Sequence, residues 1–125
     1  MEYEIKATVS HKFCDEDLND LVSTALEGGI NYWCGEAKVK EDSMSEEAYD
    51  KLNFISDAVS KGGVLILFDA ESDDTWELNR DKLLKGIQMY CEKHNVAPSD
   101  LMDMYDANDA DTIVQYAVFD EMMFA

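Results

Sequence analysis

The segment from residue 64 to residue 78 constrains the fold more than any other part of the sequence. It begins with the continuous apolar run Val64–Phe68, passes through the acidic, turn-rich stretch Asp69–Asp74, and ends with Trp76–Leu78. Two short apolar runs separated by turn-forming residues predict a β-hairpin with a long acidic loop. Because the strands of a hairpin are antiparallel, we expect a mostly antiparallel sheet.

Two further segments have the patterns of strands. Residues 2–9 alternate apolar with polar side chains, which is typical of a half-buried strand. The aromatic-rich segment Ile30–Cys34 favours another strand, which can extend towards residue 40 past a bulge near Gly35. With the hairpin, these segments predict four strands.

Helical spacing of apolar residues predicts two helices in the first half of the chain. One begins at the capping residue Asp15, carries an apolar stripe over residues 18–26, and ends at the glycine pair 28–29. The other runs from about residue 45 to residue 60. Ser43 and Glu46 form a capping box before it, and the glycines at 62–63 stop it.

Two more helices are expected in the second half. Asn79 caps the first of them, which contains Gly86 at a cost of up to ~1 kcal/mol relative to alanine. Residues 100–111 hold five aspartates and are expected to form an irregular connection, after which Asp109 or Asp111 caps a last helix. The sequence thus predicts a single α+β domain over residues 1–125, with about four helices packed on one face of the sheet.

The charge of the chain limits its binding partners. Ten Lys and Arg stand against 28 Asp and Glu, which gives a formal net charge of −18. Such a charge repels nucleic acid and anionic membranes and attracts a basic protein, a divalent cation or a polyamine, although acidity can also serve solubility alone. We therefore expect no direct binding of nucleic acid or of a membrane.

The sequence also indicates a compartment. It has no basic start followed by an apolar run, and no apolar stretch approaches the ~20 residues that span a bilayer. Three widely spaced cysteines, Cys14, Cys34 and Cys91, do not resemble a disulfide framework. These features predict a cytoplasmic protein with reduced thiols.

No recognisable catalytic or cofactor motif is present. His11 and His94 are the histidines that could serve as a base, and neither lies in a catalytic motif. The chain contains neither the dinucleotide-binding nor the phosphate-loop glycine pattern. We predict a protein that is not an enzyme, without catalytic residues or cofactors.

Metal binding is considered at two places. His11 with Cys14, and Cys91 with His94, have ligand types that zinc prefers, but such spacing arises by chance, and Cys91 and His94 also fit the apolar face of a helix. The acidic loops at 69–74 and 100–111 lack the glycine and glutamate positions of a calcium hand. We predict no specific metal site.

Two groups of large apolar residues remain. Trp33 and Trp76, on predicted strands, are expected to fill the core. An apolar end follows the last helix, and our hypothesis is that it forms part of an interface with a second copy, giving a homodimer, or with a partner. Its residues are Phe119, Met122, Met123 and Phe124.

Four segments resemble a known group of proteins. They are Glu27–Cys34, Asp69–Ser72 with Trp76, Leu83–Ile87 and Asp109–Ala117, and their most specific parts read GGINYWC and DADTIVQYA. They are similar to a family of small acidic proteins of tailed phages and prophages of gut bacteria. The resemblance implies a phage accessory protein in the host cytoplasm and transfers no site residues.

A small acidic phage protein can inhibit a basic host protein by imitating nucleic acid. Clustered carboxylates on a rigid scaffold imitate the row of phosphates that duplex DNA presents. The partner would be a nucleic-acid-binding protein of host defence or DNA handling, and the alternatives are a homo-oligomer that sequesters a small molecule or a structural interaction protein. The expected charge carriers are Asp15, Glu16, Asp17, Asp69, Glu71, Asp73, Asp74, Asp100, Asp103, Asp106, Asp109 and Asp111.

Overall fold

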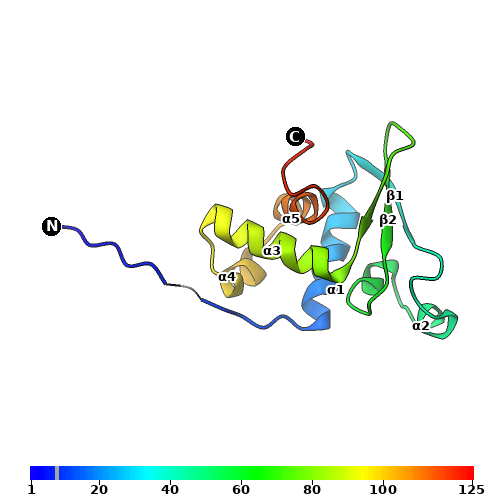
Figure 1. Cartoon of the computed structure of the whole chain (residues 1–125), viewed down its shortest axis with the longest axis horizontal. Coiled ribbons are helices and arrows are strands. Elements are labelled where there is room, and N and C mark those ends of the chain that lie inside the picture. Colours follow the sequence, from blue (N-terminus) through cyan, green and yellow to red (C-terminus); the bar gives the residue numbers. More distant parts are fainter. Residues whose placement is uncertain (8) are drawn as a thin grey trace.

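The sheet contains three antiparallel strands in the order β1-β2-β3 among residues 1–7 and 9–125, which this computed structural model describes (Figure 1). The strands are β1 (Cys34–Val39), β2 (Leu65–Asp69) and β3 (Thr75–Leu78). Val39 lies opposite Leu65, and Leu65 lies opposite Leu78. The predicted hairpin of β2 and β3 is confirmed, as is the bulge near Gly35, since the register shifts between Cys34 and Glu36.

Two of the expected strand segments were placed wrongly. Residues 1–7 and 9 form no strand; they are exposed and extend away from the helices (Figure 1), while residue 8 lies outside the described part of the chain. A period-two pattern needs a partner strand to pair with, and among the described residues this segment pairs with none. Ile30–Trp33 form a turn instead of a strand, so β1 begins only at Cys34.

The first predicted helix is confirmed, including its end at the glycine pair 28–29, but its cap differs. α1 (Asp15–Thr24) continues as a π-helical segment, Ala25–Gly29, and its cap is Cys14 rather than Asp15. The Asp17 carboxylate accepts a hydrogen bond from the Cys14 backbone N–H at 3.0 Å, which satisfies one free donor at the helix start. Gly29 permits close packing, since a Cβ there would lie 2.6 Å from the Ala107 carbonyl oxygen.

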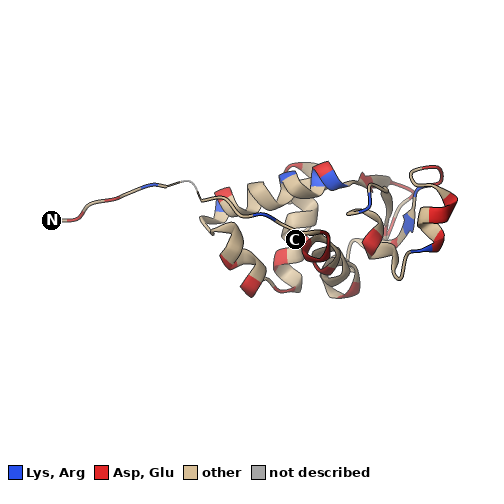
Figure 2. Cartoon of the chain, turned by 90° about the horizontal axis from the view of Figure 1, so that it is seen from below, with Lys and Arg blue, Asp and Glu red and all other residues tan. Residues whose placement is uncertain are grey.

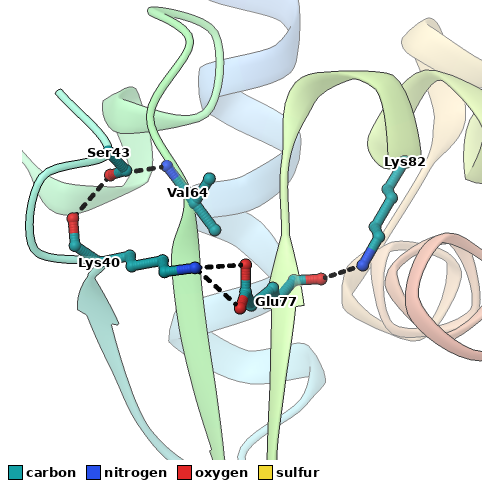
Figure 3. A network of polar contacts seen from close by, with 5 residues as sticks. All are labelled: Lys40, Ser43, Val64, Glu77 and Lys82. Atoms are coloured by element: carbon teal, nitrogen blue, oxygen red, sulfur yellow. Dashed lines mark hydrogen bonds and ion pairs between the residues drawn. The ribbon is translucent and has the colours of Figure 1, made fainter.

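The helix expected over residues 45–60 is broken into two short pieces. α2 (Glu46–Asp50) is capped by Ser45, not Ser43, and a 3₁₀ turn covers Ile55–Ala58. The hydroxyl of Ser43 instead accepts the N–H of Val64 at the start of β2 and donates to the Lys40 carbonyl (Figure 3). The apolar spacing that predicted one helix is thus met by two separate turns.

Three helices form the second half of the chain. α3 (Arg80–His94) is capped by Asn79 as predicted and ends at Asn95, which is left-handed. Residues 100–111 are not an irregular connection, because they contain most of α4 (Pro98–Met104) and the start of α5 (Ala107–Phe119). The cap of α5 is Asp106, so the predicted caps at Asp109 and Asp111 were wrong.

Helices α1, α3 and α5 pack together on one face of the sheet (Figure 1). Leu65, Leu67 and Leu78 are fully buried on this face. α3 contacts α5 closely because position 86 has no side chain; a Cβ on Gly86 would lie 2.5 Å from the Ile113 carbonyl oxygen. Among the described residues, no helix is both long and apolar enough to cross a bilayer.

Candidate functional site

Most of the acidic residues predicted as charge carriers fall into two groups at opposite ends of the molecule; of the others, Asp15 and Glu16 are exposed in the first turn of α1, where Asp15 pairs with Lys61 at 3.8 Å, and Asp111 is buried. One group lies where α4 and the start of α5 meet α1, and the other lies in the β2–β3 loop (Figures 1 and 2). We name the first group the acidic corner, and it consists of Asp17, Asp20, Asp100, Asp103, Asp106 and Asp109. Asp20 was not among the predicted carriers; it lies on α1 and is exposed.

A reciprocal pair of hydrogen bonds fixes the acidic corner. The Asp106 carboxylate accepts the N–H of Asp109 at 2.9 Å, and the Asp109 carboxylate accepts the N–H of Asp106 at 3.1 Å. Asp109 also accepts the hydroxyl of Tyr90 at 2.8 Å. Burial, this bond, and the charges of Asp109 and Asp106 raise the pKa of Tyr90 to about 12. The two carboxylates are therefore held in place by backbone groups at the start of α5, and Asp109 also by Tyr90 of α3.

Tyr105 links α4 to α1. Burial raises its pKa, a hydrogen bond with Thr24 lowers it, and the charges of Asp20 and Asp17 raise it further. The charges of Asp17 and Asp20 on α1 thus act on the hydroxyl of Tyr105, which directly follows α4. Among the described ion pairs, none involves a carboxylate of the acidic corner. Within the part of the chain that the structure describes, its negative charge is therefore not neutralised by an ion pair.

The second group is the acidic loop between β2 and β3. Asp69 is tied down, because its carboxylate accepts the N–H of Glu71 and the hydroxyl of Ser72. Glu71, Asp73 and Asp74 are exposed. Their side chains thus carry the charge of this end of the molecule.

Asp111 lies in the core and cannot contribute to an acidic surface, which corrects its prediction as a charge carrier. It is only 7% exposed, and its carboxylate accepts three hydrogen bonds. The donors are Trp33 Nε1 at 2.8 Å, the Tyr32 hydroxyl at 2.6 Å and Gln115 Nε2 at 2.9 Å. Burial and the contact with Asp111 raise the pKa of Tyr32 to about 12. This carboxylate joins the turn before β1 to α5.

The Asp111 network was missed at the sequence level. Asp111 and Gln115 are four residues apart and share one face of α5, which is a signal available once the helix is placed. Tyr32 and Trp33 are 79 and 78 residues distant from Asp111, and no local pattern connects them. Only the packing of the turn on α5 reveals the network.

The apolar end after α5 folds back on the chain. Gln115, which is fully buried, accepts the N–H groups of Met123 and Phe124 through Oε1, each at 2.9 Å. Its Nε2 donates to the Phe124 carbonyl at 3.2 Å. Asp120, left-handed with φ 63°, makes the turn that allows this return.

Four aromatic rings form one cluster beneath this end. Phe124 stacks on Trp33 with centroids 5.2 Å apart, and Phe119 meets Trp76 edge to face at 5.0 Å. Trp33 is buried, as predicted, although it lies in a turn rather than a strand. The two phenylalanines predicted as interface are therefore packed within the chain.

The predicted interface is thereby reduced to two side chains. Met122 and Met123 stay 44% and 55% exposed beside the aromatic cluster. An interface at these methionines stays a prediction.

The residues considered for zinc have other environments. Cys14 is exposed at the start of α1, whereas Cys91 is buried in α3. Burial raises the pKa of the Cys91 thiol. His94 stacks on Tyr90 at 4.2 Å, with Nε2 lying 3.2 Å from the Tyr116 hydroxyl. The described part of the chain gathers no group of three or more side chains able to hold a metal ion.

Three lysines near β3 and α3 are engaged in bonds within the chain. Lys40 pairs with the Glu77 carboxylate, and Lys82 donates to the Glu77 carbonyl at 3.1 Å (Figure 3). Lys85, one turn further along α3 than Lys82, pairs with Asp120 at the end of α5. These three lysines are therefore engaged by groups of the chain itself.

Comparisons with protein-family models, with curated proteins and with solved structures found no match for this chain. The resemblance to phage proteins therefore stays a prediction. The function is inferred below from the surface of the chain itself.

Proposed function

We propose that this chain is a non-enzymatic binding protein that inhibits a basic, nucleic-acid-binding host protein by occupying its cationic groove. In keeping with the resemblance to phage proteins, it would act in the cytoplasm of a bacterial host. The observation that carries the proposal is the acidic corner, in which Asp17 and Asp20 of α1 act on Tyr105 and the reciprocally bonded Asp106 and Asp109 begin α5, while no described ion pair gives these carboxylates a cation.

The distribution of charge along the chain supports this proposal. Residues 95–125 contain no Lys or Arg, while every described ion pair lies elsewhere or at Asp120. A positive groove would gain attraction from the corner without displacing a cation from it. The capping bonds of Asp106 and Asp109 hold two of the charges rigidly, which lowers the entropy lost on binding.

The acidic loop extends the charged surface to the other end of the molecule (Figure 2). A partner that contacted both groups would bind along the long axis of the domain. A groove that holds duplex nucleic acid is elongated in the same way. Such a groove recognises spaced negative charge and needs no base to read.

The test is affinity capture of the tagged chain from a bacterial lysate, with elution in a salt gradient. We expect a basic nucleic-acid-binding protein that elutes as salt rises and that added duplex DNA displaces. Salt screens charge contacts at a surface, with a Debye length of about 10 Å at 0.1 M. A captured protein indifferent to both salt and DNA, or no captured protein, would contradict the proposal.

A charge variant makes the test specific to the corner. Asp20, Asp100 and Asp103 are exposed and make no described side-chain hydrogen bond, so changing all three to asparagine spares the caps. A matched control changes Glu41→Gln, Glu46→Gln and Asp50→Asn, which alters the net charge equally on the α2 side. Capture should be lost in the corner variant and retained in the control; equal loss in both would leave only a general effect of charge.

A further inference from the structure

The first residues of the chain form an arm with the pattern of a strand and no partner. Tyr3, Ile5 and Val9 lie on one side of the period-two pattern and are 82%, 90% and 58% exposed. In both views the arm leaves the body on the side away from the sheet (Figures 1 and 2). The arm of one copy therefore reaches outward, where a sheet of another copy can meet it.

The sheet has an open edge at β1. The N–H of Lys40 donates to the Val64 carbonyl, so the backbones of Lys40 and Lys38 pair towards β2. Amides alternate in direction along an antiparallel strand, and Ala37 and Val39 must therefore direct theirs outward. No described hydrogen bond uses these outward groups. They form a template for one more strand.

The opposite edge, β3, is partly covered. Glu77 directs its carbonyl to this edge, where the Lys82 ammonium donates to it (Figure 3). α3 also begins two residues after β3 ends. β1 is therefore the edge that can accept a strand.

The surroundings of β1 suit the arm in shape. A cavity of about 300 Å³ lies beside this strand, and its walls include Leu26, Ala37 and Ile55. Ala37 and Val39 share one face of β1, so the apolar side of an added strand would lie against this cavity. Tyr3, Ile5 and Val9 supply that apolar side.

The other side of the added strand would be polar on both partners. On its solvent face β1 and its extension carry Glu36, Lys38 and Lys40, where Lys38 pairs with Glu36 and Lys40 pairs with Glu77 of β3. The corresponding side of the arm carries Glu2, Glu4 and Lys6. These side chains stay in water on both strands, so the pairing would bury no unpaired charge.

We propose that residues 2–9 of one copy add as a strand to the β1 edge of a second copy, and that reciprocal exchange of the two arms forms a symmetric dimer. Each copy gives an arm and receives one, which closes the assembly and removes both open edges. The backbone groups give the affinity, and the apolar side of the arm sets the register.

The test measures the mass of the full chain in solution over a range of concentrations, at about 0.15 M salt, where the Debye length is about 8 Å. We expect a dimer, with hydrogen exchange of the arm amides and of Ala37 and Val39 slowing as the dimer forms. Ile5→Asp places a charge against the cavity and should weaken the dimer at least about tenfold. The control Ser10→Asp adds the same charge on the other side of the arm pattern and should have little effect.

Three results would overturn the proposal. One is a chain that stays monomeric at its highest soluble concentration with arm amides exchanging as in an unstructured peptide. Another is protection of the arm in the monomer, which would mean that the arm pairs with the β1 edge of its own copy. The third is a dimer unaffected by Ile5→Asp, which would place the interface elsewhere, for example at Met122 and Met123.

Discussion

Replacing Asp111 with alanine should destabilise the fold more than any other single change to a carboxylate. Asp111 accepts hydrogen bonds from Trp33, Gln115 and Tyr32, and it is 7% exposed. Alanine fits α5 without strain, so the loss would come from the donors left behind. The change therefore isolates the contribution of one buried charge.

The size of the expected loss in free energy of unfolding follows from the environments of the three hydrogen-bond donors. Trp33 is 2% exposed, so Trp33 Nε1 would lose its buried acceptor at about 1–3 kcal/mol, whereas Gln115 Nε2 would keep the Phe124 carbonyl and the Tyr32 hydroxyl as acceptors. The Tyr32 hydroxyl belongs to a half-exposed residue and can turn to water. Removing one partner of a buried charged group typically costs about 3–5 kcal/mol, and we expect a loss in this range. For a domain of this size, the loss corresponds to roughly 10–20 °C in melting temperature.

Urea denaturation followed by circular dichroism and by tryptophan fluorescence measures this loss. Asp103→Ala is the matched control: Asp103 is exposed on α4, and its loss should change the free energy of unfolding by less than about 0.5 kcal/mol. Asp111→Asn, which keeps one carbonyl acceptor, should fall between the two. If Asp111→Ala unfolded within about 1 kcal/mol of the unaltered chain, the buried network would not be holding the turn to α5.

Further predictions test other parts of the fold. The pKa values of Tyr32 and Tyr90 are raised to about 12, so the stability that these hydroxyls contribute is complete below pH 10 and is lost as pH rises to 12. A tyrosine absorbance titration should show hydroxyls that ionise only near pH 12. The variants Tyr32→Phe and Tyr90→Phe should each lack one of these ionisations. Gly86→Ala should lose about 1–3 kcal/mol in denaturant unfolding despite a better helix propensity, because its Cβ would lie 2.5 Å from a carbonyl oxygen of α5; a gain would refute this packing. Gln115→Ala should free the residues after α5 and change the fluorescence of Trp33, and an unchanged spectrum would show that the aromatic contacts suffice.

Elements with complete local signals were predictable from the sequence. α1 has an apolar stripe and a glycine end, the hairpin has two apolar runs about a turn, and α3 has the cap Asn79. In each case the signal and the structure it specifies lie within about twenty residues. Periodicity and capping act at that range, so they were sufficient here.

The segment from residue 98 to residue 111 was misread because one residue type has two roles. Aspartate is favoured in loops and at helix starts alike, and five of them suggested a loop. Pro98 at the first turn of α4, and Asp106 with Asp109 three residues later, were the signals for helices. Asp111 gave no such signal, since its partners Tyr32 and Trp33 come from the other half of the chain.

The arm shows a different reason for failure. Its period-two pattern states that one side can be buried, but not which strand buries it. Among the described residues of a single copy no strand pairs with the arm, and residues 2–7 and 9 stay exposed. A period-two pattern shows that a segment can pair with a strand, and that strand can belong to another molecule.

The structural roles of individual carboxylates narrow the proposed function. Asp17, Asp106 and Asp109 cap helices, Asp69 holds the hairpin loop, and Asp111 lies in the core. Acidity needed only for solubility would not require carboxylates of three helices to lie together without a cation. Asp20, Asp100 and Asp103 have no described structural bond and still lie at this corner, so a positive partner surface is the interaction that would best explain their position.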